Sequence, residues 1–203
     1  MVANVVEQTI PVNQLNQDIE QFPQVHPITK DMHITHKGVS RLVMIDRYSF
    51  KDTEKKTLKA GDFVVLTVKQ DPKFPARGLG IIHSINHEKK SAKILIEEDY
   101  RHVLDGDEQT TGIIERSLDI IEKPLEIYYE QIAKRNATGL AAVEKTEEKR
   151  QEWFEKFYEQ LVALNFIPAG RVIYGAGSET EVTFFNCYVM PFVADSREGI
   201  SDH

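Results

Sequence analysis

The middle of the chain alternates between apolar and polar positions in the way that β-strands do. Residues 63–68 form a β-branched and aromatic run after the turn sequence 60–62, and residues 92–97 alternate strictly. Two prolines within residues 71–75 predict a break, because proline cannot donate to a sheet ladder. A further apolar run covers residues 79–85. Gly78 before it and Gly80 within it indicate a bend or bulge. Short strands at this spacing predict a small β-barrel-like module over residues 35–122.

Residues 123–166 change to a helical period and predict a helical region. Pro124 suits a first helical position, and the apolar positions 125, 128, 129 and 132 share one helix face. Residues 136–139 are expected to interrupt this helix, before a longer one from about Val143 to Asn165. The apolar stripe of the longer helix contains Trp153, Phe154 and Phe157. We expect this stripe to pack within the chain, with a docking surface for a partner subunit as the alternative.

The two ends of the chain differ from its centre. Residues 1–34 are polar with a weak apolar stripe and predict a loosely packed arm. In residues 167–203, Pro168–Arg171 is expected to stop the preceding helix and residues 175–178 to form a flexible loop. Residues 183–191 are strand-like, and Asp195 or Ser196 is placed to cap a helix start. Overall, the pattern predicts an α+β fold whose last domain is incomplete at His203.

Composition excludes several classes of protein. The 203 residues carry 25 basic against 32 acidic side chains, a net charge of −7, which argues against general nucleic-acid binding. The single cysteine, Cys187, excludes an intrachain disulfide and a paired-cysteine zinc site. We find no signal-peptide pattern and no apolar run long enough for a membrane span, so we expect a cytoplasmic protein without membrane or nucleic-acid partners.

Single motifs give little specific chemistry. His26, His33 and His36 lack a complete ligand set, so no metal site is predicted. The Gly175-x-Gly177 loop fits neither a dinucleotide fingerprint nor a P-loop. Cys187 lies in an apolar run, where an inert buried thiol is the usual outcome and a redox role needs an accessible sulfur and a partner cysteine.

Several spaced elements together resemble the large subunit of ribonucleotide reductases. They are Pro168-Ala-Gly-Arg171, Gly175-Ala-Gly177, Phe185-Asn-Cys-Tyr-Val189 and Asp195-Ser-x-x-Gly-Ile200. The pattern is most similar to the adenosylcobalamin-dependent (class II) enzymes, and residues 47–52 and the β zone resemble the N-terminal extension of one bacterial branch. By this resemblance, residues 167–203 begin the reductase α/β barrel and contain its first strand.

The resemblance also implies roles for individual residues. Cys187 matches one of the cysteine pair that reduces the ribose, with its partner further along the family's chain. Gly170, Asn186 and Cys187 match segments that contact the ribonucleotide substrate, a diphosphate in this branch, and Asp195 and Ser196 match the start of a segment that binds a deoxynucleotide or ATP effector. The implied cofactor is adenosylcobalamin, and the implied reductant is a thioredoxin-like protein. The chemistry would be thiyl-radical conversion of ribonucleotides to 2′-deoxyribonucleotides.

The residues of the radical site are not recognisable in this sequence, so the chain alone is expected to be inactive. A split gene whose second polypeptide completes the barrel, an interrupted reading frame and a fragment all fit an end at His203. The rival interpretation is a non-catalytic small-β-barrel module for binding or assembly, in which Cys187 is only a core residue.

Overall fold

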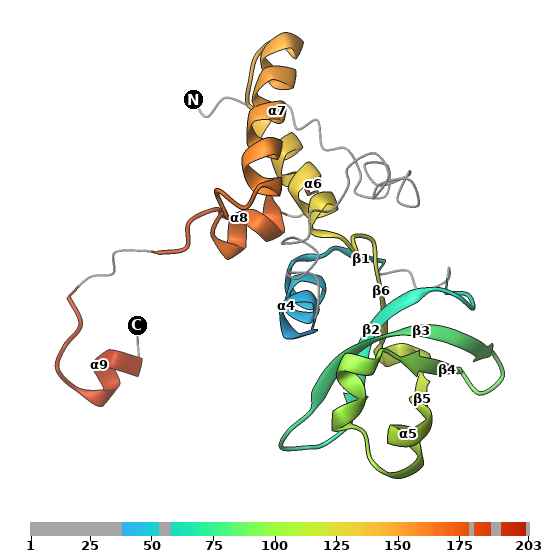
Figure 1. Ribbon diagram of the computed structural model, residues 1–203. Helices are drawn as coiled ribbons and strands as arrows, with labels where there is room; N and C mark the ends of the chain where they lie inside the picture. The colour runs from blue at the N-terminus through green and yellow to red at the C-terminus, as the bar shows by residue number, and fades with distance from the viewer. Residues whose placement is uncertain (1–37, 53–57, 179–180, 188–191, 202–203) are drawn as a thin grey trace.

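The computed structural model describes residues 38–52, 58–178, 181–187 and 192–201, and shows a mixed α+β chain (Figure 1). A β-sheet with short helices occupies residues 38–124, and longer helices follow. The predicted arm at 1–34, with its three histidines, lies outside the described residues. No helix among the described residues is long and apolar enough to cross a membrane.

The sheet has six strands in the order β1-β6-β2-β3-β4-β5, and every neighbouring pair is antiparallel. The strands are β1 (Lys51–Asp52), β2 (Phe63–Lys69), β3 (Ala76–Asn86), β4 (Ser91–Ile96), β5 (Ile113–Ser117) and β6 (Ile121–Pro124). The described strands form an open sheet with β1 and β5 at its edges. The predicted β region is therefore confirmed as an antiparallel sheet, while barrel closure is not observed.

The strand pattern explains most of this sheet. In β4 the side chains of Ala92, Ile94 and Ile96 are buried and alternate with more exposed ones, as predicted. The run 79–85 does contain an irregularity of the predicted kind, but the register of β3 shifts between Ile82 and Ser84 and not at Gly78 or Gly80. The two glycines serve close packing: a Cβ at Gly80 would lie 2.7 Å from the Leu95 carbonyl oxygen.

Short helical segments connect the strands and close the core. They are α4 (Gly38–Val43), the π-helical turn η1 (Met44–Tyr48), the 3-10 turns η2 (Glu98–Val103) and η3 (Leu118–Ile120), and α5 (Gly106–Thr111). Arg77 of β3 ties η1 to the sheet, since it pairs with Asp46 at 2.7 Å and with Glu122 of β6. The core contains mostly aliphatic side chains from the sheet and these turns, among them Ile45, Leu66, Leu79, Ile94, Ile114 and Ile121.

Helices α6 (Tyr129–Ala141) and α7 (Glu147–Val162) are joined by a short connection and pack against each other. Their small shared core contains Ala133, Ala137 and Leu161. Phe154, Phe157 and Tyr158 pack against this core, as expected of the aromatic stripe, whereas Trp153 contacts Phe157 and Lys156 of its own helix. Two details of the prediction are wrong. Pro124 ends β6, where it pairs with Lys51, and the first helix starts only at Tyr129.

The predicted interruption at 136–139 is also wrong, since α6 runs through to Ala141. A glycine stands at position 139 inside the helix because the backbone of Gly177 lies directly against it. A Cβ at Gly139 would lie 2.0 Å from the Gly177 nitrogen, which no ordinary contact allows. Gly139 therefore marks a close backbone contact and does not end the helix.

The last described segments follow α7. A short helix α8 (Gly170–Gly175) packs on α6, residues 181–187 have no regular secondary structure, and α9 (Arg197–Ser201) stands apart from the rest in Figure 1. Pro168–Arg171 does not simply end a helix, because Gly170 and Arg171 begin α8. The expected strand over 183–191 is absent from 183–187, which make no ladder, and 188–191 lie outside the described residues. The start of an α/β barrel is therefore not observed here.

Candidate functional site

The predicted substrate residues Gly170, Asn186 and Cys187 lie in α8 and in the segment 181–187, whereas Asp195 and Ser196 lie directly before α9, apart from them (Figure 1). Arg171 of α8 donates a hydrogen bond from Nη1 to Thr183 Oγ1 at 3.0 Å. A Cβ at Gly175 would lie 2.1 Å from a methyl group of Val182 and 3.1 Å from the Phe184 ring, so the two segments touch closely at this glycine. The structure thus joins the turn that contains Gly170 to the segment that contains Asn186 and Cys187.

Gly170 itself faces the N-terminal part of the molecule. A Cβ added to it would meet the Tyr48 ring and hydroxyl oxygen at 3.4 Å, which is ordinary contact distance. Tyr48 is the last residue of η1, so η1 lies against the predicted substrate turn. The resemblance drew attention to residues 47–52, and within them Tyr48 lies beside Gly170 and the Phe50 ring stacks on Tyr174 of α8.

Cys187 is a free, exposed thiol, and Asn186 beside it is also exposed. An inert thiol sealed in a core, which the apolar run favoured, is therefore not what the structure shows. The Asn186 side chain donates to the Phe184 carbonyl oxygen at 3.5 Å. Asp195 and Ser196 are exposed, and Ser196 Oγ accepts a hydrogen bond from the Gly199 amide at 2.9 Å. The predicted helix start with Ser196 as its cap is confirmed.

A buried ion pair anchors α8 to the rest of the chain. Arg135 of α6 and Glu126, which follows β6, are both fully buried, and Arg135 Nε lies 2.7 Å from Glu126 Oε1. Arg135 Nη2 donates to Glu126 Oε2 and to the Tyr48 carbonyl, both at 3.2 Å. Its Nη1 donates to the carbonyl oxygens of Tyr174 at 3.0 Å and Ala176 at 2.8 Å. All five N–H donors of the guanidinium are used.

Glu126 is held equally firmly. Its Oε2 accepts from the Phe50 amide at 3.2 Å, and its carbonyl oxygen accepts from the Ser49 hydroxyl at 2.6 Å. The Phe50 ring lies 4.7 Å from the Arg135 guanidinium carbon and stacks on Tyr174 at a centroid distance of 5.1 Å. Residues 48–50, 126, 135 and 174–176 therefore form one cluster, which we call the Arg135 anchor.

The predicted flexible loop at 175–178 is in fact packed against this anchor. Ala176 is buried, and Ser178 donates from its hydroxyl to the Gly175 carbonyl oxygen at 2.8 Å. Gly177 has a φ of +74°, and a Cβ there would lie 2.2 Å from the Arg135 carbonyl oxygen. Both glycines of the Gly-x-Gly motif thus serve close packing.

Two cavities are lined in part by α6, and one of them is also lined by α8. An apolar cavity of about 350 Å³ lies between α4, α6 and α8 and is lined in part by Val39, Tyr48, Tyr129, Leu164 and Ile173. Burial there, together with the negative charge of Glu130, raises the pKa of Tyr129 to about 12, so its hydroxyl stays neutral.

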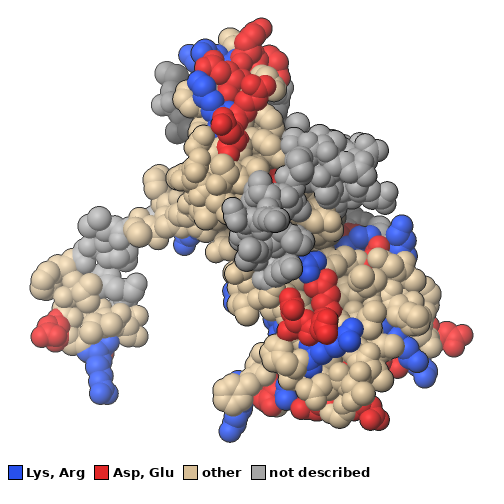
Figure 2. Space-filling view, in the orientation of Figure 1, with Lys and Arg blue, Asp and Glu red and all other residues tan. Residues whose placement is uncertain are grey.

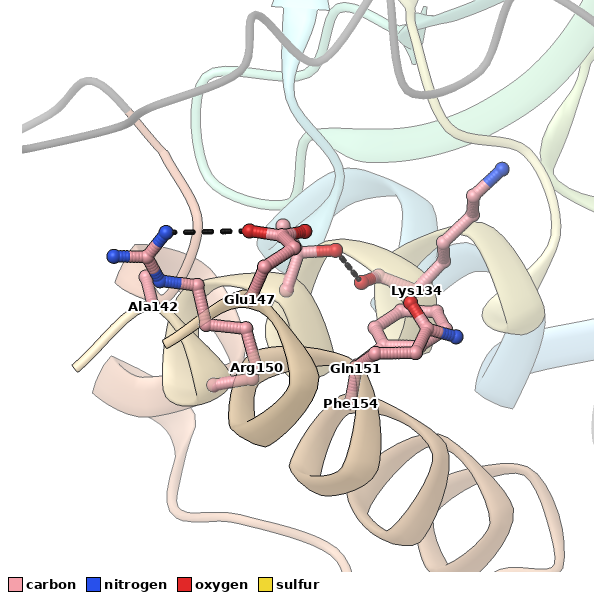
Figure 3. A pocket seen from close by; sticks show the side chains of 8 residues that line it. Lys134, Ala142, Glu147, Arg150, Gln151 and Phe154 are labelled. Atoms are coloured by element: carbon pink, nitrogen blue, oxygen red, sulfur yellow. Dashed lines mark hydrogen bonds and ion pairs between the residues drawn. The ribbon is translucent and has the colours of Figure 1, made fainter. Parts of the chain in front are cut away.

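A second cavity of about 280 Å³ lies between α6 and α7. Figure 3 shows its Arg150–Glu147 pair, with atoms 3.3 Å apart, and the Lys134 side chain extending away from them. Figure 2 shows charges of both signs mixed at the outer end of α7, which gives no single-sign patch there.

The described residues hold no group of three or more His, Cys, Asp or Glu side chains that could bind a metal ion. The two cavities described above, of about 280 and 350 Å³, are too small to enclose a corrin cofactor. Neither of them fits adenosylcobalamin.

Sequence reasoning missed the Arg135 anchor. The signal was the predicted apolar helix face: positions 129 and 132, which lie in α6, continue in helical steps to 135 and 136, which are charged and polar. A charge on an apolar stripe indicates a buried, paired side chain.

Comparison with known families identifies one match. Residues 118–181 match the family described as "Ribonucleotide reductase, all-alpha domain". The matched region spans α6, α7 and α8 with their connections, and it includes both Glu126 and Arg135. Neither the curated proteins nor the solved structures gave a match.

Proposed function

We propose that this chain is the N-terminal part of a ribonucleotide reductase and that Cys187 is one of its two reducing cysteines. The observation that carries the proposal is that the region matched to the reductase all-alpha domain ends at residue 181, where it meets the segment that contains Cys187. That segment packs on α8 through Val182 and Phe184. The exposed thiol also supports it, because a cysteine that reduces a substrate must be accessible.

The proposed reaction replaces the 2′-hydroxyl of a ribonucleotide with hydrogen. One carbon–oxygen bond breaks and the oxygen leaves as water. Two thiols, Cys187 and a second cysteine outside this chain, give up two electrons and become one disulfide. A thioredoxin-like dithiol then reduces that disulfide for the next turnover.

Other residues of the site would bind and orient the nucleotide. Gly170 has no side chain to stand between its turn and a ligand, so that backbone N–H groups of the turn could approach a phosphate oxygen. Asn186, next to Cys187 in the sequence, would contact the ribose. Asp195 and Ser196 would contribute to the effector site, with the carboxylate accepting hydrogen bonds from ribose hydroxyls.

Adenosylcobalamin is the radical source that the class II resemblance implies. When bound, such a cofactor supplies the radical that starts the reaction. Neither of the two cavities fits it, so we place its binding surface in the remainder of the reductase and derive no step through it.

A substitution at Cys187 tests the proposal in the complete reductase. We expect Cys187→Ser to abolish multiple turnover with a thioredoxin-like reductant, because the disulfide cannot form. Folding should be unchanged, because Cys187 is exposed. Steady-state deoxyribonucleotide formation and thermal unfolding check the two statements. Full multiple-turnover activity in the variant would remove the redox assignment.

A further inference from the structure

Arg135 forms hydrogen bonds to three segments that are distant from one another in the sequence. Its five hydrogen bonds reach η1 at Tyr48, the loop after β6 at Glu126, and the last turn of α8 at Tyr174 and Ala176. Two of the five therefore fix backbone carbonyl groups directly before the segment with Asn186 and Cys187. We propose that Arg135 is a positioning residue that sets the place of α8 and, through α8, of residues 181–187.

The end of α8 packs so closely against α6 that it cannot move nearer to that helix. The backbone at Ala176 and Gly177 lies against Gly139 and the Arg135 carbonyl, where a single added Cβ would come within about 2 Å. The guanidinium then holds the same backbone by Nη1 from another direction. Close packing restricts the approach of α8, and the planar, forked donor set of arginine restricts its register.

Contact then continues from α8 to the cysteine segment. Gly175 touches Val182 and Phe184, and Arg171 donates to Thr183. Asn186 in turn donates to the Phe184 carbonyl. A displacement of the last turn of α8 would therefore move the residues that directly precede Cys187.

A buried ion pair contributes little net stability, because desolvation offsets much of the attraction. What distinguishes Arg135 is that its donors bind main-chain carbonyls of separate segments. Lysine keeps the charge but has a compact ammonium with three donors, so it cannot serve all five acceptors. The inference rests on the proposed function only for its catalytic consequence.

Three variants of the full chain separate positioning from plain stabilisation. Arg135→Lys keeps the charge and removes part of the donor fork, whereas Glu126→Gln disturbs the same ion pair and leaves the donors to Tyr174 and Ala176 in place. Arg116→Lys is the matched control in the sheet module, where Arg116 pairs with Glu108 at 3.0 Å and donates to the Val68 carbonyl at 2.6 Å. Thermal unfolding measures the general loss of stability in each.

Residue-resolved hydrogen exchange is the decisive readout. The amides of Ala176 and Ser178 donate to the carbonyls of Val172 and Gly175 and report on this turn. We expect Arg135→Lys to raise their exchange rates about tenfold, the value of one charge-assisted hydrogen bond. Glu126→Gln and Arg116→Lys should leave these amides unchanged relative to the rest of the chain. Equal effects of all three variants, or wild-type exchange in Arg135→Lys, would overturn the inference.

A double variant serves as the test if Arg135→Lys does not fold. Glu126→Gln/Arg135→Gln removes both buried charges and keeps hydrogen-bonding groups at both positions. The exchange rates of the Ala176 and Ser178 amides are then measured in it. In the complete reductase, Arg135→Lys should lower kcat about tenfold or more, with a smaller change in KM. Loss of activity in Cys187→Ser together with wild-type exchange in Arg135→Lys contradicts only the positioning role. Raised exchange with an active Cys187→Ser variant contradicts only the proposed function.

Discussion

The sheet module and the helical region are held together by different chemistry. The sheet buries a continuous set of aliphatic side chains, and its ion pairs, such as Arg77 with Asp46, are only partly buried. The helical region has a core of two alanines and a leucine, and its fully buried side chains include Glu126, Gln131 and Arg135. Aliphatic contacts have no preferred direction, whereas the Glu126–Arg135 pair uses every guanidinium donor and therefore favours one arrangement of its partners. These directional contacts lie in the region that precedes the cysteine segment.

The largest effect is expected from a cavity in the sheet. Ile94 is fully buried and pairs across the sheet with Ile82 and Ile114. Ile94→Ala should lower the free energy of unfolding by about 2–5 kcal/mol, because the site cannot collapse around the lost atoms. Urea denaturation measures this loss. The exchange rates of the α8 amides should rise only as much as the loss of global stability explains. A larger rise in α8 than elsewhere would contradict the proposed difference between the sheet and the helical region.

A smaller loss of stability is expected from a glycine-to-alanine substitution in α6, where such a substitution would usually stabilise the helix. Alanine normally stabilises a helix interior relative to glycine, but a Cβ at Gly139 would meet the Gly177 nitrogen at 2.0 Å. Gly139→Ala should therefore destabilise the chain by about 1–3 kcal/mol through overpacking. Gly170→Ala is the matched control, since its Cβ would find ordinary contacts at 3.4 Å. Thermal unfolding of both checks this, and a stabilised Gly139→Ala would contradict the close backbone contact.

The smallest effect concerns the exposed face of α7. Hydrogen bonds and ion pairs from Lys149 and Lys156 lower the pKa of Glu152 to about 2 from its usual 4.5. Because the folded-state pKa is depressed, this contribution is present above about pH 4.5 and is lost as the pH falls towards about 2. Glu152→Gln should show a slightly weaker fall of Tm across that range than the wild type. Salt should reduce the difference, since the charges are exposed. Identical profiles would show that the pair contributes nothing.

Local rules predicted much of the fold. The strict alternation in β4, the proline break before β3 and the aromatic stripe of α7 each follow from periods of two or 3.6 residues. The exceptions depended on distant contacts. Gly139 continues a helix because Gly177 packs against it, and Pro124 ends a strand because it pairs with Lys51. No local pattern contains these partners.

The candidate site was predictable only in part. Spaced motifs pointed to Gly170, Asn186 and Cys187, and the structure joins their segments through Gly175 and Arg171. A charge at position 135 could have indicated a buried ion pair, but the other acceptors of Arg135, the backbone carbonyls of Tyr48, Tyr174 and Ala176, could not be predicted. Any residue type could supply those carbonyls, so the sequence carries no signal for them.

Disulfide mapping after one turnover is the most direct test of the central claim that Cys187 reduces the substrate. The complete, prereduced reductase would be given ribonucleotide without external reductant, quenched, alkylated and digested. The account predicts that Cys187 is recovered in a disulfide with a second cysteine, in an amount equal to the deoxyribonucleotide formed. Product formation with Cys187 recovered as an alkylated free thiol would contradict it.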